Sequence, residues 1–164
     1  MRWQRAMVTG ASSGIGESIA RQLAARGTDL VLVARRGDRL EELANQLSVD
    51  VEVLVADLAD DDERGRAEAR LTSDDEPIDL LVANAGIAWI GSILESDVDN
   101  ADTMIRLNVL SLARMVHLVL PRMVAAGRGG ILVTSSTASF QPTPFSANYG
   151  ATKAFVTSLA EAVH

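Results

Sequence analysis

A glycine-rich stretch near the start of the chain limits the possible folds more than any other feature. Residues 8–16 read VTGASSGIG, so three glycines stand between a short apolar run and the start of a helical pattern. Glycine has no Cβ and lets the backbone come close to a bulky anion, and the free N–H groups at the start of a helix attract negative charge. An ordinary tight turn has the same spacing. The rest of the chain decides between the two interpretations.

Length and composition indicate one globular domain over residues 1–164. The chain is 48% hydrophobic and only 4% aromatic, so its core must be aliphatic. The formal net charge of −7 argues against a nucleic-acid partner, because such proteins present a clustered positive face.

The chain contains no cysteine and two histidines, His117 and His164. The lack of cysteine excludes disulfides and thiolate chemistry, and two distant histidines predict no metal site. We find no signal-type segment at the N-terminus and no apolar run that approaches the length of a membrane span. These observations favour a cytoplasmic protein without a membrane partner.

Apolar periodicity predicts strands that alternate with helices. The apolar run at 30–34 is continuous, which is typical of a strand covered on both faces. Gly27 is expected to end the first helix in a left-handed conformation. The predicted strands are at 6–9, 30–34, 51–55, 79–83 and 130–134, and the predicted helices are at 15–25, about 40–47, 60–71, about 102–126 and from 149 to the terminus.

Strands separated by helices are joined by crossovers, so the sheet should be parallel with helices on both faces. Right-handed crossovers make it a doubly wound α/β sheet, in which ligands bind beyond the carboxyl ends of the strands. Polar residues follow four of the predicted strands and should meet at that edge: the glycine-rich turn, Asp57, Asn84 to Gly86, and Ser135 with Ser136. This agreement favours a dinucleotide site over a purely structural turn.

These segments resemble the motifs of the short-chain dehydrogenase/reductase family, from Ala6 to the last helix, in the family's order and at similar spacing. The resemblance implies a Rossmann-like sheet with strand order 3-2-1-4-5. The matching segments are the cofactor turn TGASSGIG at 9–16, the adenine-contacting Asp57, the strand-four motif Asn84-Ala85-Gly86, the helix residue Asn108, the catalytic Ser136, and Tyr149 with Lys153 as the Tyr-x-x-x-Lys pair.

Tyr149 and Lys153 are four residues apart on a predicted helix and therefore share one face. A free tyrosine is a weak acid with a pKa of about 10, and a nearby ammonium favours the phenolate, which suits general acid–base catalysis. The resemblance also implies that Lys153 hydrogen-bonds the nicotinamide ribose. An ordinary solvated helix face carries such pairs too.

Ser136 and Asn108 complete the catalytic set that the resemblance implies. Ser136 stands at the end of the fifth predicted strand, thirteen residues before Tyr149, from where its hydroxyl can help hold a substrate oxygen. Asn108 matches the family residue at a break in the long helix that holds a water leading to the lysine; an asparagine in mid-helix is otherwise a local defect. Ser135 is expected to be structural.

The end of the second predicted strand indicates NADP in preference to NAD. An acidic residue there binds the ribose 2′-OH of NAD, whereas an arginine accommodates a 2′-phosphate. We expect Arg35 to be the chief contact, Arg36 to stack or to point to solvent, and Asp38 to lie in the first turn of the next helix. The expected cofactor contacts are Gly10, Ser12, Ser13, Gly14, Ile15, Gly16, Arg35, Arg36, Asp57, Leu58, Asn84, Ala85, Gly86, Tyr149 and Lys153.

Apolar residues in two loops at this edge, Trp89, Ile90, Phe140 and Phe145, favour an uncharged small-molecule carbonyl or alcohol as substrate. Packing of these loops on the sheet explains the same residues equally well.

The chain is shorter than the family pattern, in which another strand, a Pro-Gly turn, a substrate lid and a final strand and helix follow. The resemblance thus implies a domain without the lid and the last strands, in which the fifth strand is a sheet edge and Ile131 and Val133 are partly uncovered. Either the sequence is a fragment of a longer protein or a partner covers that edge.

Apolar residues surround much of the predicted helices 102–126 and 149–164, through which family members commonly pair. We therefore expect a homodimer or homotetramer. Three functions stay open: an NADP-dependent oxidoreductase acting on a carbonyl/alcohol pair, a truncated and catalytically inactive cofactor-binding or oligomerisation module, and an assembly fragment that binds no cofactor.

Overall fold

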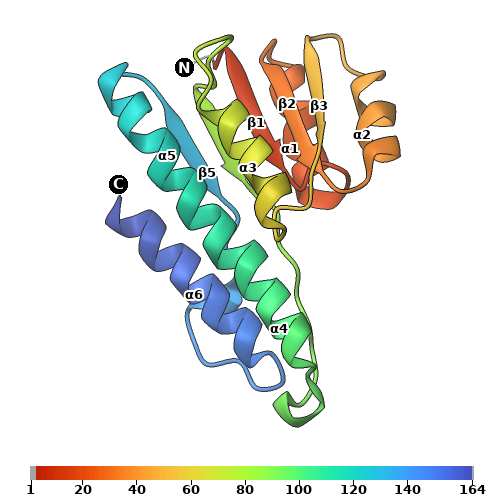
Figure 1. Ribbon diagram of the computed structural model, residues 1–164, viewed down its shortest axis with the longest axis vertical. Coiled ribbons are helices and arrows are strands. Elements are labelled where there is room, and N and C mark those ends of the chain that lie inside the picture. The colour runs from red at the N-terminus through yellow and green to blue at the C-terminus, as the bar shows by residue number, and fades with distance from the viewer. Residues whose placement is uncertain (1–2, 164) are drawn as a thin grey trace.

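The protein folds around a parallel sheet, seen in a computed structural model that describes residues 3–163 (Figure 1). Its strands have the order β3-β2-β1-β4-β5, and every neighbouring pair is parallel. This confirms the predicted doubly wound sheet, and each strand lies within a residue of its predicted bounds. The strands are β1 (Arg5–Thr9), β2 (Asp29–Ala34), β3 (Val51–Val55), β4 (Leu80–Ala83) and β5 (Gly130–Val133).

Helices α1 (Gly14–Ala24) and α2 (Gly37–Ala44) cover one face of the sheet. Their apolar stripes bury Leu23 and Leu40 against strand side chains such as Leu32. Gly27 has a φ of 76°, which confirms the predicted left-handed end of the first helix. α2 stops at Ala44, so Leu47 follows the helix and does not belong to it.

The other face carries α3 (Asp61–Leu71), α5 (Leu112–Ala125) and α6 (Ala147–Ala162). Met115, Val119 and Val156 pack there against Val31 and Leu81. Helices cover β1, β2 and β4 on both faces. Almost all side chains of these strands are therefore buried, and the residues in the middle of each strand are apolar.

The long helix differs from its prediction in two ways. It starts earlier, with α4 (Val98–Ile105), because the Asp97 carboxylate accepts a hydrogen bond from Asp99 N at 3.0 Å and caps the helix. A π-helical segment, Arg106–Ser111, then separates α4 from α5 and contains Asn108. Such segments are often found at functional sites.

The helical stretch Val98–Ala125 is long and apolar enough to cross a membrane by length and composition, which contradicts the expectation that no segment reaches that length. In this fold its α5 part packs on the sheet, where Met115 and Val119 are each 1% exposed, and its α4 part extends beyond the sheet. Core helices of globular proteins show the same composition.

β5 forms an edge of the sheet and pairs, within the described residues, with β4 alone. Ile131 and Val133 are half-buried, as expected, and Leu132 between them is more exposed, at 43%. The edge thus presents apolar side chains as well as unpaired backbone groups.

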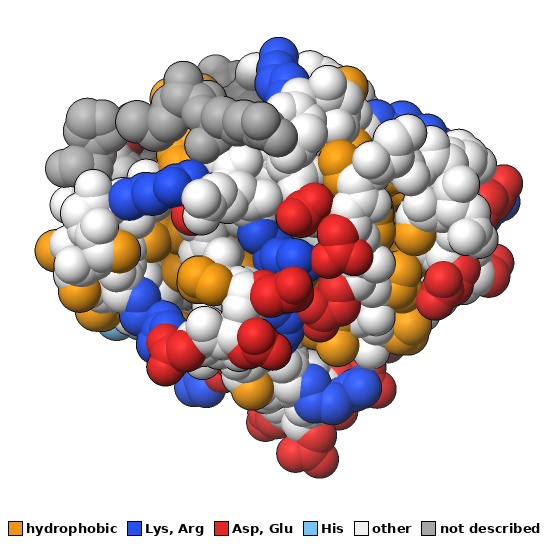
Figure 2. Space-filling view, turned by 90° about the horizontal axis from the view of Figure 1, so that it is seen from above, with side chains coloured by type: hydrophobic (Ala, Val, Ile, Leu, Met, Phe, Trp, Pro, Cys, Tyr) orange, Lys and Arg blue, Asp and Glu red, His pale blue; other side chains and the backbone are white. Residues whose placement is uncertain are grey.

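At the edge where the strands begin, opposite charges hold the chain together. The buried Arg5 guanidinium pairs with Asp50 at 2.9 Å and with Glu76 at 3.1 Å, and the Asp79 carboxylate accepts hydrogen bonds from the backbone N–H groups of Gln4 and Arg5. Viewed from above, acidic and basic side chains gather near the middle of this face (Figure 2). Ion pairs thus join β1 to the segments before β3 and β4.

At the opposite edge, β1 enters α1 through the glycine-rich turn. Gly10 and Gly14 have φ values of 68° and 60°, which favour glycine. A Cβ on Gly16 would lie 2.4 Å from the carbonyl oxygen of Gly10, so the turn and the helix approach too closely for any side chain.

We therefore predict that Gly16→Ala lowers the free energy of unfolding by about 1–3 kcal/mol, the usual cost of overpacking. Gly65→Ala is the matched control, because Gly65 lies inside α3 with no atom within 4 Å of a Cβ, and it should stabilise the protein by about 0.5–1 kcal/mol. Urea titration of both variants provides the measurement. Equal stability of the two variants would contradict the close approach at Gly16.

Candidate active site

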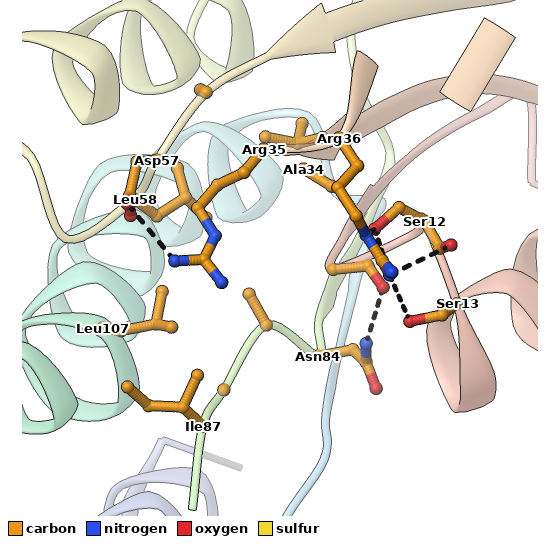
Figure 3. A pocket seen from close by; sticks show the side chains of 15 residues that line it. Ser12, Ser13, Ala34, Arg35, Arg36, Asp57, Leu58, Asn84, Ile87 and Leu107 are labelled. Carbon is orange, nitrogen blue, oxygen red and sulfur yellow. Dashed lines mark hydrogen bonds and ion pairs between the residues drawn. The ribbon is translucent and has the colours of Figure 1, made fainter. Parts of the chain in front are cut away.

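A cleft of about 200 Å³ lies at the carboxyl edge of the sheet (Figure 3). It brings together the turn after β1, the end of β2 and the segments after β3 and β4. Gly14, Ile15 and Gly16 begin α1 beside it. The predicted cofactor residues that line the cleft are Gly10, Ser12, Ser13, Arg35, Arg36, Asp57, Leu58, Asn84, Ala85 and Gly86.

The N-terminus of α1 adjoins this cleft. Ser13 stands at the N-cap position, but its side chain makes no capping hydrogen bond. The first N–H groups of the helix therefore lack a side-chain partner, and together with the helix dipole they favour an anion.

Asn84 ties the ends of three strands together. Its Nδ2 donates to the carbonyl oxygen of Thr9 at 3.0 Å, and its Oδ1 accepts from Thr134 Oγ1 at 3.0 Å. Thr9 Oγ1 in turn accepts from the backbone N–H groups of Asn84 and Ala85. Asn84 thus fixes the shape of the cleft floor. Thr134 was not among the predicted site residues.

Arg35 and Arg36 point in different directions (Figure 3). Arg35 Nη1 lies 3.6 Å from Asp57 Oδ2, on the far side of the cleft. Arg36 Nη2 donates to the hydroxyls of Ser12 at 3.0 Å and Ser13 at 2.7 Å. Arg36 therefore contacts the glycine-rich turn, an arrangement that was not expected from the sequence. Asp38 lies in the first turn of α2, as predicted.

Asp57 is held in a short turn between β3 and α3. Its Oδ1 accepts from Ala59 N at 3.0 Å, and its own N–H donates to Glu63 Oε2 at 2.6 Å. The neighbouring Leu58 is buried. This turn presents the Asp57 carboxylate toward Arg35 across the cleft.

Tyr149 and Lys153 are the only tyrosine and the only lysine of the chain. Both lie on α6, and Lys153 Nζ is 5.9 Å from the centroid of the Tyr149 ring. Lys153 is 5% exposed, and its Nζ donates to the carbonyl oxygen of Thr134 at 2.6 Å. Burial lowers the pKa of the Lys153 ammonium because it removes water from the charged form. Within residues 3–163 the Tyr149 hydroxyl has no hydrogen-bond partner, so it can bond to a ligand.

Ser136 begins a short 3₁₀ turn, Thr137–Ser139, where its Oγ accepts from Ala138 N at 3.2 Å. This turn packs closely on α6, since a Cβ on Gly150 would lie 3.4 Å from the Ala138 carbonyl oxygen. Ser136 is thereby anchored near the residue that follows Tyr149. Its neighbour Ser135 lies 2.6 Å, Oγ to Oγ1, from Thr157, which joins β5 to α6 and suits the expected structural role.

Asn108 is 2% exposed, and its side chain is fully hydrogen-bonded. Its Oδ1 accepts from Ile87 N at 2.9 Å, and its Nδ2 donates to Ile87 O at 2.9 Å and Thr152 Oγ1 at 3.1 Å. Gly86 fits between Asn108 and Lys153, because a Cβ there would lie 3.1 Å from Asn108 Oδ1 and 3.6 Å from Lys153 Nζ. The Asn108 amide therefore joins the loop after β4 to α6.

The apolar loop residues divide between a pocket and the surface. Trp89 and Phe145 line a pocket of about 210 Å³ beside α4, and the Ser146 hydroxyl joins the two loops by donating to Trp89 O at 3.2 Å. Phe145 is nevertheless mostly exposed, as are Ile90 and Phe140, and Phe140 lines a second pocket beside α6. Figure 1 shows α4 and the first turns of α6 extending beyond the sheet at this end.

Solved structures with the same fold are similar over nearly the whole chain. A short-chain dehydrogenase from Sphingobium yanoikuyae, in complex with NADPH, is 39% identical with a TM-score of 0.92, over 98% of this chain and 64% of that one. A bulky-bulky ketone specific alcohol dehydrogenase from Comamonas testosteroni is 34% identical with a TM-score of 0.92, over 99% of this chain and 67% of that one.

Sequence relatives lead to the same group of enzymes. An uncharacterised oxidoreductase of Staphylococcus epidermidis is 35% identical over 96% of this chain and 69% of its own length. A very-long-chain 3-oxoacyl-CoA reductase of Anas platyrhynchos is 36% identical over 97% of this chain, which spans only 53% of that relative. The family model for short chain dehydrogenases matches residues 4–164. The chain therefore belongs to the short-chain dehydrogenase/reductase family, whose cofactor-binding fold it contains.

Proposed function

We propose that this chain is the NADP(H)-binding part of an oxidoreductase that transfers a hydride between NADP(H) and a carbonyl/alcohol pair. The observation that carries this proposal is the position of the only tyrosine and the only lysine of the chain, one turn apart on α6. Lys153 Nζ lies beside Gly86, which lines the cleft: a Cβ on Gly86 would be 3.6 Å from it.

The cleft suits a dinucleotide that carries a 2′-phosphate. The uncapped start of α1 offers N–H groups to a diphosphate, and the guanidinium of Arg36 lies beside the hydroxyls of Ser12 and Ser13. No acidic residue follows β2 directly, and Arg35 faces the cleft from the same strand end. Two similar structures were solved with NADPH and with NADP. When bound, NADPH would supply the hydride.

Side chains of the protein would exchange a proton with the substrate oxygen and hydrogen-bond to it. The Tyr149 hydroxyl donates a proton to that oxygen during reduction, and the Tyr149 phenolate accepts one during oxidation. The Ser136 hydroxyl, whose oxygen already accepts from Ala138 N, donates to the same oxygen and stabilises its developing charge. The Lys153 ammonium favours the phenolate that remains and hydrogen-bonds the ribose. The Asn108 backbone would hold a water next to Lys153.

An uncharged substrate with bulky apolar groups fits the loops beyond the sheet. Trp89, Phe140 and Phe145 surround this region without a charged side chain among them. The alcohol dehydrogenase described as specific for bulky-bulky ketones supports the same class. The helices α4, α5 and α6 would pair two copies, because Ile105, Leu118 and Phe155 on them are more than a third exposed.

Two observations favour a second function. β5 is an exposed edge of the sheet, and this chain spans only 53% of the 3-oxoacyl-CoA reductase that it matches. In that case the chain binds the cofactor or another subunit without catalysis. Turnover by the wild-type chain separates the two functions.

Tyr149→Phe should lower kcat/KM by about 10²- to 10⁴-fold, the usual contribution of a general acid. The Kd for NADPH should stay within about threefold of wild type, because Tyr149 does not line the cleft at the glycine-rich turn, where most of the expected cofactor contacts lie. Hydride transfer is followed by the absorbance of NADPH, and binding by its fluorescence. Undiminished turnover in this variant would reject Tyr149 as the acid, and NADPH binding without wild-type turnover would favour the second function.

Arg35→Ala and Arg36→Ala should each weaken NADPH binding by about tenfold or more, since a hydrogen bond to a charged group contributes about 1.5–3 kcal/mol. NADH binding should hardly change. Arg39→Ala is the control, because Arg39 lies on α2 and pairs with Glu42 at 3.3 Å. Calorimetric titration of both cofactors measures the effect. Tighter binding of NADH than of NADPH by the wild type would overturn the cofactor assignment.

The lowered pKa of Lys153 predicts how turnover depends on pH in the alkaline range. Turnover that needs the ammonium is present below this pKa and falls as the pH rises through it, earlier than for an exposed lysine. Lys153→Arg keeps its charge at alkaline pH, so its alkaline limb should move to higher pH even though kcat drops. If both proteins lose activity at the same pH, a different group titrates.

A further inference from the structure

Thr152, between Tyr149 and Lys153 on α6, has a buried hydroxyl that the proposed reaction does not use. The residue is 3% exposed. Its Oγ1 donates to the carbonyl oxygen of Tyr149 at 2.8 Å and accepts from Asn108 Nδ2 at 3.1 Å. The first bond is common for a threonine inside a helix. The second bond, to a residue 44 positions earlier in the chain, needs a different explanation.

That second bond completes a small buried network. Asn108 lies in the π-helical segment and binds both the N–H and the C=O of Ile87, the residue after Gly86 of the cleft. The second hydrogen of the Asn108 amide is donated to Thr152 Oγ1. Three segments, namely the loop after β4, the π-helical segment and α6, therefore meet through two side chains. Buried networks that are fully satisfied define one arrangement of the parts they join.

The catalytic end of α6 depends on that arrangement. Lys153 follows Thr152 directly, and its Nζ reaches Thr134 O at 2.6 Å. A shift of α6 by about an ångström would take this contact out of the normal hydrogen-bond range. Another hydroxyl link of α6, between Thr157 and Ser135, lies one turn beyond Lys153. Ser135 Oγ also donates to the Lys153 carbonyl oxygen at 3.4 Å, and Thr157→Val leaves this bond in place.

We propose that Thr152 is a positioning residue, which anchors α6 to Asn108 so that Tyr149 and Lys153 keep their places beside Gly86. This inference rests on the function proposed above. Thr152 touches neither cofactor nor substrate and acts through its two neighbours.

The test compares three variants of the full chain. Thr152→Val keeps the shape and removes both hydrogen bonds, Thr152→Ser keeps the hydroxyl, and Thr157→Val removes the hydroxyl link to Ser135. Thr152→Val should lower kcat by about tenfold or more while the KM for NADPH changes less than about threefold, which is the signature of an interaction needed in the transition state. Thr152→Ser should restore most of the wild-type kcat. Thr157→Val should lower the melting temperature without changing kcat.

Because the chain has one lysine, ¹⁵N-lysine labelling gives a single side-chain amine signal that needs neither cofactor nor turnover. This signal should shift or broaden in Thr152→Val and match the wild type in Thr152→Ser and Thr157→Val. An unchanged signal together with an unchanged kcat in Thr152→Val would overturn the inference. A wild-type chain without turnover would overturn the proposed function alone, and the lysine signal would then decide whether Thr152 positions Lys153.

Discussion

The hydrogen bonds of Thr134 hold the two halves of the site together. Its hydroxyl donates to Asn84, which fixes the glycine-rich turn, and its carbonyl oxygen accepts from Lys153 on α6. One residue, directly after β5, thus links the cleft at the glycine-rich turn to α6. Both bonds are partly buried, and the bond from the Lys153 ammonium is charge-assisted and therefore stronger than a bond between neutral groups. The relative position of cleft and helix follows from this junction.

Close backbone approach is the second constraint. Gly10 and Gly16 let Asn84 reach the turn, and Gly86 leaves room between Asn108 and Lys153. A side chain at any of these three positions would collide with the amide groups that organise the cleft. The glycines are therefore needed for internal packing whether or not a phosphate binds at the turn, which explains why spacing alone does not separate the two interpretations.

Much of this arrangement could be predicted from the sequence. The features that could not be predicted were missed for physical reasons. The strands β1, β2 and β4 were found because burial on both faces makes their central residues apolar, and sheet order followed from the family resemblance. The early start of α4 was missed because Asp97, its cap, stands in a loop rich in polar residues. Thr134 was missed because it accepts Lys153 through a backbone carbonyl, which has no sequence signature. The contact of Arg36 with Ser12 depends on a rotamer, and no periodicity encodes it.

The account depends on one spatial relation, that α6 presents Tyr149 and Lys153 to the nicotinamide end of a cofactor bound over the glycine-rich turn. A crystal structure of the chain with NADPH measures it most directly. The account predicts that Lys153 Nζ hydrogen-bonds the nicotinamide ribose and that the Tyr149 hydroxyl lies next to the nicotinamide ring. A cofactor whose nicotinamide lies away from α6, or whose diphosphate does not meet the start of α1, would contradict it.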